Sequence, residues 1–150
     1  GHATAYADVS YRCAYLKTYY PAEFLAARLQ VLGGFYYPAV YMAEAIRLGI
    51  AVRPPHVNYS GTRFTLVAGA TLYMGLGQVR DLRDSAARAI VAERRKAPYD
   101  GLRDLLARVD LQPKEVDHLI RCGALDGLSD RASLLASPVT RCADPEAPGR

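Results

Sequence analysis

The chain has 150 residues, of which 51% are hydrophobic and 23% charged, and its formal net charge is +4. This length allows one ordinary domain or two small ones. No apolar run approaches the roughly 18 residues that span a bilayer, so we expect no membrane partner. The mild positive charge allows a polyanionic partner without requiring one.

The cysteines and histidines predict neither a metal site nor a catalytic set. Cys13, Cys122 and Cys142 are odd in number and lack zinc-ligand spacing. Cys13 and Cys122 fall at apolar positions of expected helices, so we expect buried, reduced thiols and a cytoplasmic location. The three histidines are far apart in sequence and the acidic residues are scattered, so an independent small enzyme is disfavoured.

Three helices are predicted in the first fifty residues. Residues 3–18 carry aromatic and aliphatic side chains at helical spacing. Pro21 and Pro38 each suit a first helical position, and Gly33-Gly34 and Gly49 suit the ends of the second and third helices. The expected apolar faces consist of Tyr6, Val9, Cys13 and Leu16; Phe24, Leu25, Leu29 and Leu32; and Val40, Tyr41, Ala45, Ile46 and Leu48.

The pattern then changes to one typical of strands. Residues 50–52 form a short extended run, and residues 64–67 and 71–74 flank Ala68-Gly69-Ala70, which predicts a β-hairpin. Helical spacing returns at Asp84, at Leu102 and at Pro113, where Gly123 ends the helix. Ser129 is the expected N-cap of a last helix through about Leu135. The tail 137–150 lacks periodicity and is expected to be disordered.

Two motifs near the middle of the chain each have more than one interpretation. Gly75-Leu-Gly77 lacks the third glycine of a dinucleotide fingerprint and no βαβ unit surrounds it, so these are interpreted as turn glycines. The short helices of residues 76–135 are joined by tight turns, at 81–83, 110–112 and 123–127. Helix–hairpin–helix units that bind a phosphate through backbone amides have this form, and a plain helical packing module fits equally well.

Motifs spread over about residues 1–136 resemble the alpha subunit of bacterial DNA polymerase III, the C-family polymerases. The residues that carry the resemblance occur in the family's order: His2-Ala-x-Ala-Tyr6, Ser10-Tyr-Arg-Cys-Ala-Tyr-Leu-Lys17, Tyr20-Pro-Ala-Glu-Phe24, Ala43-Glu-Ala-x-Arg-Leu-Gly-Ile50, Pro54-Pro55-x-Val57-Asn58-x-Ser60, Phe64-Thr65, Gly75-Leu-Gly77-x-Val79 and Leu119-Ile-Arg-Cys-Gly-Ala-Leu-Asp126. Each motif is modest, and their common order makes the resemblance specific.

The resemblance implies a mainly α fold with a small β-hairpin. Residues 1–50 would be the C-terminal part of the polymerase fingers, 51–75 a β-hairpin connector, and 76–136 a tandem helix-hairpin-helix module that follows the new duplex. The family uses two magnesium ions held by palm aspartates, and nothing in this chain matches those motifs. We therefore expect a fragment of a longer polymerase that holds no cofactor and is inactive alone, with magnesium belonging to the parent enzyme.

The first hairpin departs from the family pattern, which usually has glycine, a hydrophobic residue and glycine. Here Asp81-Leu82-Arg83 places two β-carbons and a carboxylate where bare amides would meet phosphate. Arginine side chains would then replace amide contacts. The expected DNA-binding residues are Arg80, Arg83, Ser85, Arg88 and Lys114.

The first helix of the family runs near the incoming nucleotide. By resemblance, His2, Tyr6, Arg12 and Lys17 are candidate nucleotide-proximal residues, with a tyrosine stacking on a base and a cation reaching a phosphate. Tyr6 and Tyr11 could instead serve only in packing.

The sequence thus predicts part of a replicative or error-prone DNA polymerase that binds duplex DNA without sequence preference. Its expected partners are double-stranded DNA and the remaining polymerase domains. The alternative is an inert packing or protein-interaction piece with no DNA binding of its own, which would expose apolar patches.

Overall fold

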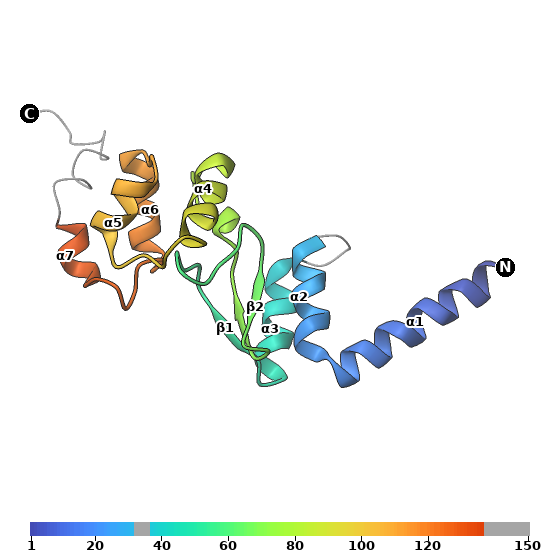
Figure 1. Cartoon of the computed structure of the whole chain (residues 1–150). Coiled ribbons are helices and arrows are strands. Elements are labelled where there is room, and N and C mark those ends of the chain that lie inside the picture. Colours follow the sequence, from blue (N-terminus) through green and yellow to red (C-terminus); the bar gives the residue numbers. More distant parts are fainter. Residues whose placement is uncertain (32–36, 137–150) are drawn as a thin grey trace, which may run out of the picture. The chain divides into compact units, whose positions relative to one another are not determined.

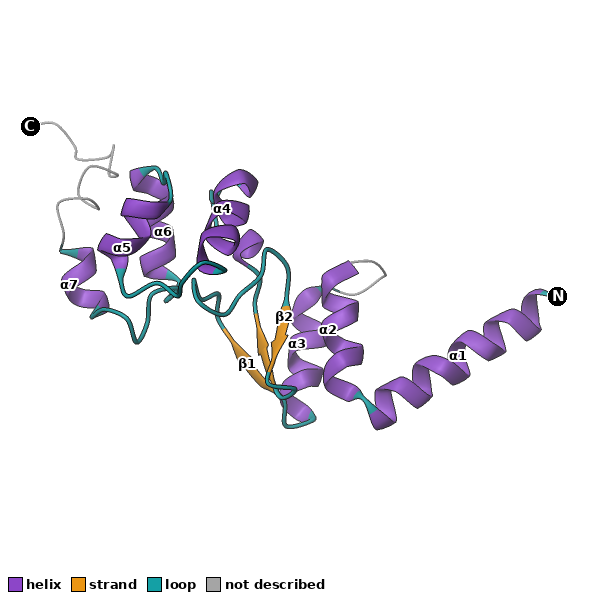
Figure 2. Cartoon of the chain, viewed as in Figure 1, coloured by secondary structure: helices purple, strands orange, loops and turns teal. Residues whose placement is uncertain are grey.

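Short helices and three brief strands make up the part of the chain that the computed structural model describes, residues 1–31 and 37–136 (Figures 1 and 2). The chain divides into two units. The first contains Gly1–Arg53 and Phe64–Tyr73, and the second contains Pro54–Arg63 and the residues from Met74 onward. The expectation of a mainly α fold with a small β element is confirmed.

The first unit combines three helices with a small sheet. Its helices are α1 (His2–Tyr19), α2 (Pro21–Val31) and α3 (Pro38–Arg47), and its strands are β1 (Ala51–Arg53), β2 (Thr65–Val67) and β3 (Thr71–Tyr73). Proline stands at the first position of both α2 and α3, as expected, because its missing N–H has no helical partner there. Gly49 follows α3 at a φ of 78°, the left-handed conformation expected of it.

The sheet has the strand order β1-β3-β2. The expected hairpin is confirmed, since β2 and β3 pair antiparallel with Leu66 opposite Leu72. β1 adds a third strand parallel to β3, which the short extended run at residues 50–52 only partly indicated. Helix α2 contacts β2 and α3 contacts β1, so these helices lie against the sheet (Figure 1).

Burial in the first unit differs from the sequence expectation. Leu25 and Leu29 of α2 are buried as expected, whereas α3 buries only Ala45 among its residues, and Val40, Ile46 and Leu48 are exposed. Within the described structure no residue of α1 is buried, and Cys13 is exposed. The expectation of a buried Cys13 was therefore wrong, because helical periodicity predicts a face but not the presence of a partner for it.

The second unit is a helical assembly around one hydrophobic core. It contains a short 3₁₀ helix, η1 (Leu76–Gln78), followed by α4 (Asp84–Arg94), α5 (Leu102–Arg108), α6 (Pro113–Arg121) and α7 (Arg131–Leu135). The four α-helices begin at or close to the predicted positions. The N-cap of α7 is Asp130, whose carboxylate accepts the Ser133 N–H at 2.9 Å, rather than the expected Ser129. The core combines Leu76, Val79, Ala87, Ile90, Tyr99, Leu105, Val116, Leu119, Ile120 and Leu125.

The loop of residues 54–63 is fixed to this helical assembly by side chains. Asn58 and Tyr99 exchange two hydrogen bonds, from Asn58 Nδ2 to the Tyr99 carbonyl at 2.9 Å and from the Tyr99 N–H to Asn58 Oδ1 at 2.8 Å. Arg94 donates to the carbonyls of Val57 and Ser60. The motif Pro54-Pro55-x-Val57-Asn58-x-Ser60 is thus explained by packing within the second unit.

Three expectations fall on residues that lie outside the described structure. They concern Gly33-Gly34 as the end of the second helix, Leu32 as part of its apolar face, and the disordered tail 137–150.

Candidate nucleic-acid interface

The first hairpin connects η1 to α4 through residues 79–83. Asp81 has a φ of 57°, the left-handed region that glycine adopts without strain, which explains why a glycine suits this position. Arg83 is the N-cap of α4 and has extended backbone angles. The first N–H groups of a helix have no partner inside it and form the positive end of its dipole, so the start of α4 is a potential phosphate site.

The second hairpin connects α5 to α6 through residues 109–112. Pro113 occupies the first helical turn of α6. Gln112 and Glu115 form a reciprocal capping box, in which the Gln112 N–H donates to Glu115 Oε2 at 2.8 Å. This box fixes the start of α6 and turns the Glu115 carboxylate toward the hairpin.

Glu115 also joins the second hairpin to the first. Its Oε1 accepts both the backbone N–H and the Nε of Arg83 at 2.9 Å, and its Oε2 accepts Arg83 Nη2 at 3.0 Å. Only 1% of Glu115 is exposed. Burial alone would raise the pKa of Glu115, but the hydrogen bonds from Arg83 and the backbone of Gln112 outweigh burial and lower it to about 2. The carboxylate therefore stays charged at neutral pH.

A second ion pair connects the first hairpin to the start of α6, nearer to solvent. Lys114 Nζ lies 3.0 Å from Asp81 Oδ2, and His118 Nδ1 lies 3.7 Å from the same oxygen. The hydrogen bond from Lys114 lowers the pKa of Asp81. The Asp81 carboxylate, expected to repel a phosphate, is thus held by a cation.

The structure places the predicted DNA-binding residues around the two helix starts. Arg80, Ser85, Arg88 and Lys114 are all exposed. Arg88 pairs with Asp84 on the same exposed face of α4. Arg83 differs from them because its guanidinium donates to Glu115 and to the Asp110 carbonyl. Arg83 and Lys114 are brought together with their acidic partners, whereas Arg88 lies one turn along α4.

Sequence reasoning missed Glu115 as a residue of this site. The available signal was Gln112-Pro-Lys-Glu115, which has the spacing of a capping box. That signal predicts the contact with Gln112, three residues away. It contains no information about Arg83, which lies 32 residues away in the chain.

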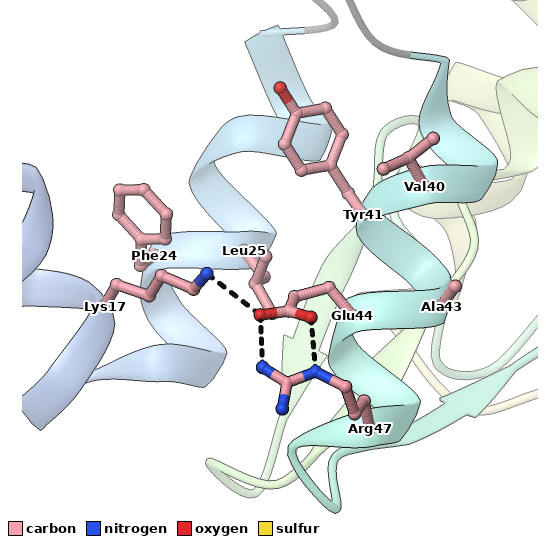
Figure 3. A pocket seen from close by; sticks show the side chains of 8 residues that line it. All are labelled: Lys17, Phe24, Leu25, Val40, Tyr41, Ala43, Glu44 and Arg47. Carbon is pink, nitrogen blue, oxygen red and sulfur yellow. Dashed lines mark hydrogen bonds and ion pairs between the residues drawn. The ribbon is translucent and has the colours of Figure 1, made fainter.

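The candidate nucleotide-proximal residues lie on α1 in the other unit. His2 and Tyr6 are exposed, and Arg12 Nε pairs with Asp8 at 3.0 Å on the helix surface. Lys17 reaches a cavity of about 390 Å³ between α1, α2 and α3, where its ammonium lies 2.9 Å from Glu44 (Figure 3). Arg47 forms two hydrogen bonds with the same carboxylate, at 2.7 and 2.8 Å. Of the four candidates, only Lys17 lines this cavity.

Residues 1–31 and 37–136 contain neither a cluster of metal ligands nor a membrane-spanning helix. In this part of the chain, no three side chains of His, Cys, Asp or Glu gather as they would around a metal ion. None of the helices there combines the length and apolarity needed to cross a bilayer.

Residues 49–134 match the family model described as "Helix-hairpin-helix motif", which covers more than half of the chain. The chain belongs to the helix-hairpin-helix family. The match includes both hairpins described above, at residues 79–83 and 109–112.

Curated relatives confirm the resemblance inferred from the sequence. The chain is 44% identical over 141 residues to the DNA polymerase III subunit alpha of Thermus aquaticus, an alignment covering 91% of this chain and 12% of that protein. It is 37% identical over 147 residues to the same subunit of Xylella fastidiosa, covering 89% and 12%. It is 38% identical over 150 residues to the error-prone DNA polymerase of Mycobacterium tuberculosis H37Rv, covering 97% and 14%. The chain thus spans 12–14% of the length of these relatives.

Proposed function

We propose that the second unit binds duplex DNA through its phosphates, without sequence preference, as part of a DNA-directed DNA polymerase. The observation that carries this proposal is the joining of two helix starts by Glu115, with exposed cations beside them. Arg83 pairs with a buried carboxylate, whereas Arg80, Arg88 and Lys114 pair with exposed carboxylates that a phosphate can replace. The phosphate contacts proposed here are therefore Arg80, Ser85, Arg88 and Lys114. Contacts of this kind position a protein on a duplex and carry no sequence information.

The similarity to polymerase subunits supports this function, and the catalytic part of such an enzyme would lie outside this chain. We propose that the palm with its two magnesium ions belongs to the longer protein and that the chain alone incorporates no nucleotide. A nucleotide-incorporation assay on this chain would contradict that view if it were positive and abolished by a mutation within these residues.

Fluorescence anisotropy with two labelled duplexes of unrelated sequence tests the DNA-binding proposal. Binding should be equal for both duplexes and should weaken with salt. The salt slope, which is the change in the logarithm of the association constant with the logarithm of the salt concentration, should be about −0.9 for each phosphate neutralised. The variants Arg80→Glu and Arg88→Glu should weaken binding to both duplexes to the same degree. Absence of duplex binding by the unaltered chain at low salt would refute the proposal.

Arg121→Glu is a matched control for Arg88→Glu. Arg121 forms an exposed i,i+4 ion pair with Asp117, as Arg88 does with Asp84, but it stands at the C-terminal end of α6. Both variants change the net charge by the same amount. A smaller loss of affinity for Arg121→Glu therefore separates local phosphate contact from the overall charge.

A second candidate function is docking onto other polymerase domains. Helix α1 favours it, because Tyr6, Val9, Tyr11 and Leu16 are exposed along a helix whose residues are all unburied in the described structure. Such apolar exposure marks interaction surfaces or association-prone ones. Light scattering with and without DNA separates the two functions, since docking alone predicts association that DNA does not change.

A further inference from the structure

Glu115 stands out among the buried residues of the described structure, because it is the one buried side chain there that carries a formal charge. A carboxylate taken out of water is costly unless charged and polar partners replace the water. Four hydrogen bonds do so here, three from Arg83 and one from Gln112. All of these donors belong to the two hairpins.

The geometry around Glu115 restricts the relative position of the hairpins. A guanidinium and a carboxylate that meet through two parallel hydrogen bonds fix both distance and orientation. The additional bond from the Arg83 backbone N–H links the N-cap of α4 directly to the third residue of α6. The starts of α4 and α6 are therefore held together by one buried group.

We propose that Glu115 and Arg83 are positioning residues for duplex binding, which hold both hairpins so that they engage one DNA molecule together. This inference rests on the proposed DNA-binding function. It assigns Arg83, predicted from sequence to contact a phosphate, to a contact within the protein, with the buried Glu115. Two sites on a rigid body bind one ligand more tightly than either alone, because the second site engages within the complex already formed.

Glu115→Gln tests the proposal, because simple electrostatics and positioning predict opposite signs. The variant removes a negative charge, which by itself would strengthen binding to a polyanion. It also weakens the link between the hairpins, so we expect duplex affinity to fall roughly tenfold or more. The salt slope should become shallower by about 0.9 for each phosphate that the variant no longer neutralises.

Asp117→Asn is the matched control on the same helix. It removes the same charge from α6, at a residue that pairs with Arg121 instead of a hairpin. Its affinity and salt slope should equal those of the unaltered chain or increase slightly. Weaker binding by a folded Glu115→Gln with normal binding by Asp117→Asn supports the proposal, and equal or stronger binding by a folded Glu115→Gln overturns it.

Arg83→Lys provides a second, independent readout should Glu115→Gln fail to fold by circular dichroism. Lysine keeps the positive charge and could still contact a phosphate, but it lacks the planar fork that Glu115 accepts. Positioning therefore predicts weaker binding and a shallower salt slope for Arg83→Lys. Unchanged binding would show that charge alone matters at this position and would overturn the proposal, whereas failure of the unaltered chain to bind would refute the underlying function.

Discussion

The two units each contain a glutamate whose pKa is about 2, and the comparison of these glutamates shows what burial adds to an ion pair. Glu44, in the first unit, owes its low pKa to hydrogen bonds from Arg47 and then Lys17. Glu115, in the second unit, reaches the same value although burial, the largest effect on its pKa, opposes it; at Glu44 burial counts for less than either hydrogen bond. The Glu44 side chain is 23% exposed and that of Glu115 is 2% exposed.

The partners also differ in their distance along the chain. Glu44 pairs with Arg47, three residues along the same helix, and with Lys17 on α1, whereas Arg83 is 32 residues from Glu115 and belongs to another element. Water reaches the partly exposed Glu44 and can replace a lost partner, so removing Arg47 should cost little stability. A buried carboxylate has no such replacement, so its partner decides whether the surrounding structure is stable. The same pKa thus corresponds to different structural consequences.

The largest expected effect comes from removing the arginine of each pair. Arg83→Met leaves the Glu115 carboxylate buried without its cation, so we expect the urea midpoint to fall clearly. Arg47→Met, the matched variant in the first unit, should shift the urea midpoint little. Urea unfolding followed by circular dichroism measures both. Equal stability losses would show that burial does not distinguish the two ion pairs.

The second prediction concerns acid. The folded pKa of Glu115 is about 2 against an ordinary value of 4.5, so its stabilising contribution is complete above about pH 4.5 and is lost as pH falls toward 2. At neutral pH this contribution is on the order of 3 kcal/mol. The stability difference between the unaltered chain and Glu115→Gln should therefore shrink across this window.

Glu44→Gln is the control for the acid experiment, because the pKa of Glu44 lies in the same range. Because an equal lowering of the pKa contributes an equal pH-dependent stability, Glu44→Gln should lose its difference from the unaltered chain over the same pH window. A flat pH profile for Glu44→Gln would show that solvent screens the ion pairs of Glu44.

The smallest expected effect concerns Asp81, whose partner Lys114 lies close to solvent. Asp81→Asn keeps a residue that tolerates the left-handed backbone and releases Lys114, so duplex affinity should rise by up to about fivefold. Asp81→Gly should bind similarly and unfold at slightly higher urea, because glycine adopts a φ of 57° without strain. Weaker binding by both variants in anisotropy would indicate that Asp81 positions Lys114 instead of competing for it.

The sequence by itself determined the local structure of this protein and its family. Pro21, Pro38 and Pro113 mark helix starts, and Gly49 and Gly123 follow helix ends with φ values of 78° and 83°. These features depend on hydrogen bonds and backbone preferences within about four residues, which a sequence displays directly. The polymerase resemblance was visible for a different reason, because its motifs occur in the family's order along residues 2–126.

The tertiary structure alone decided which charges meet and which faces are covered. It paired Arg83 with Glu115, left Cys13 exposed on α1, and placed Asp81 in the left-handed region beside Lys114. Helical periodicity shows that a face is apolar, but a partner for that face must come from elsewhere in the fold. Similarly, an arginine can satisfy a phosphate or a buried carboxylate, and only the packing of residues far apart in the chain determines which one it reaches.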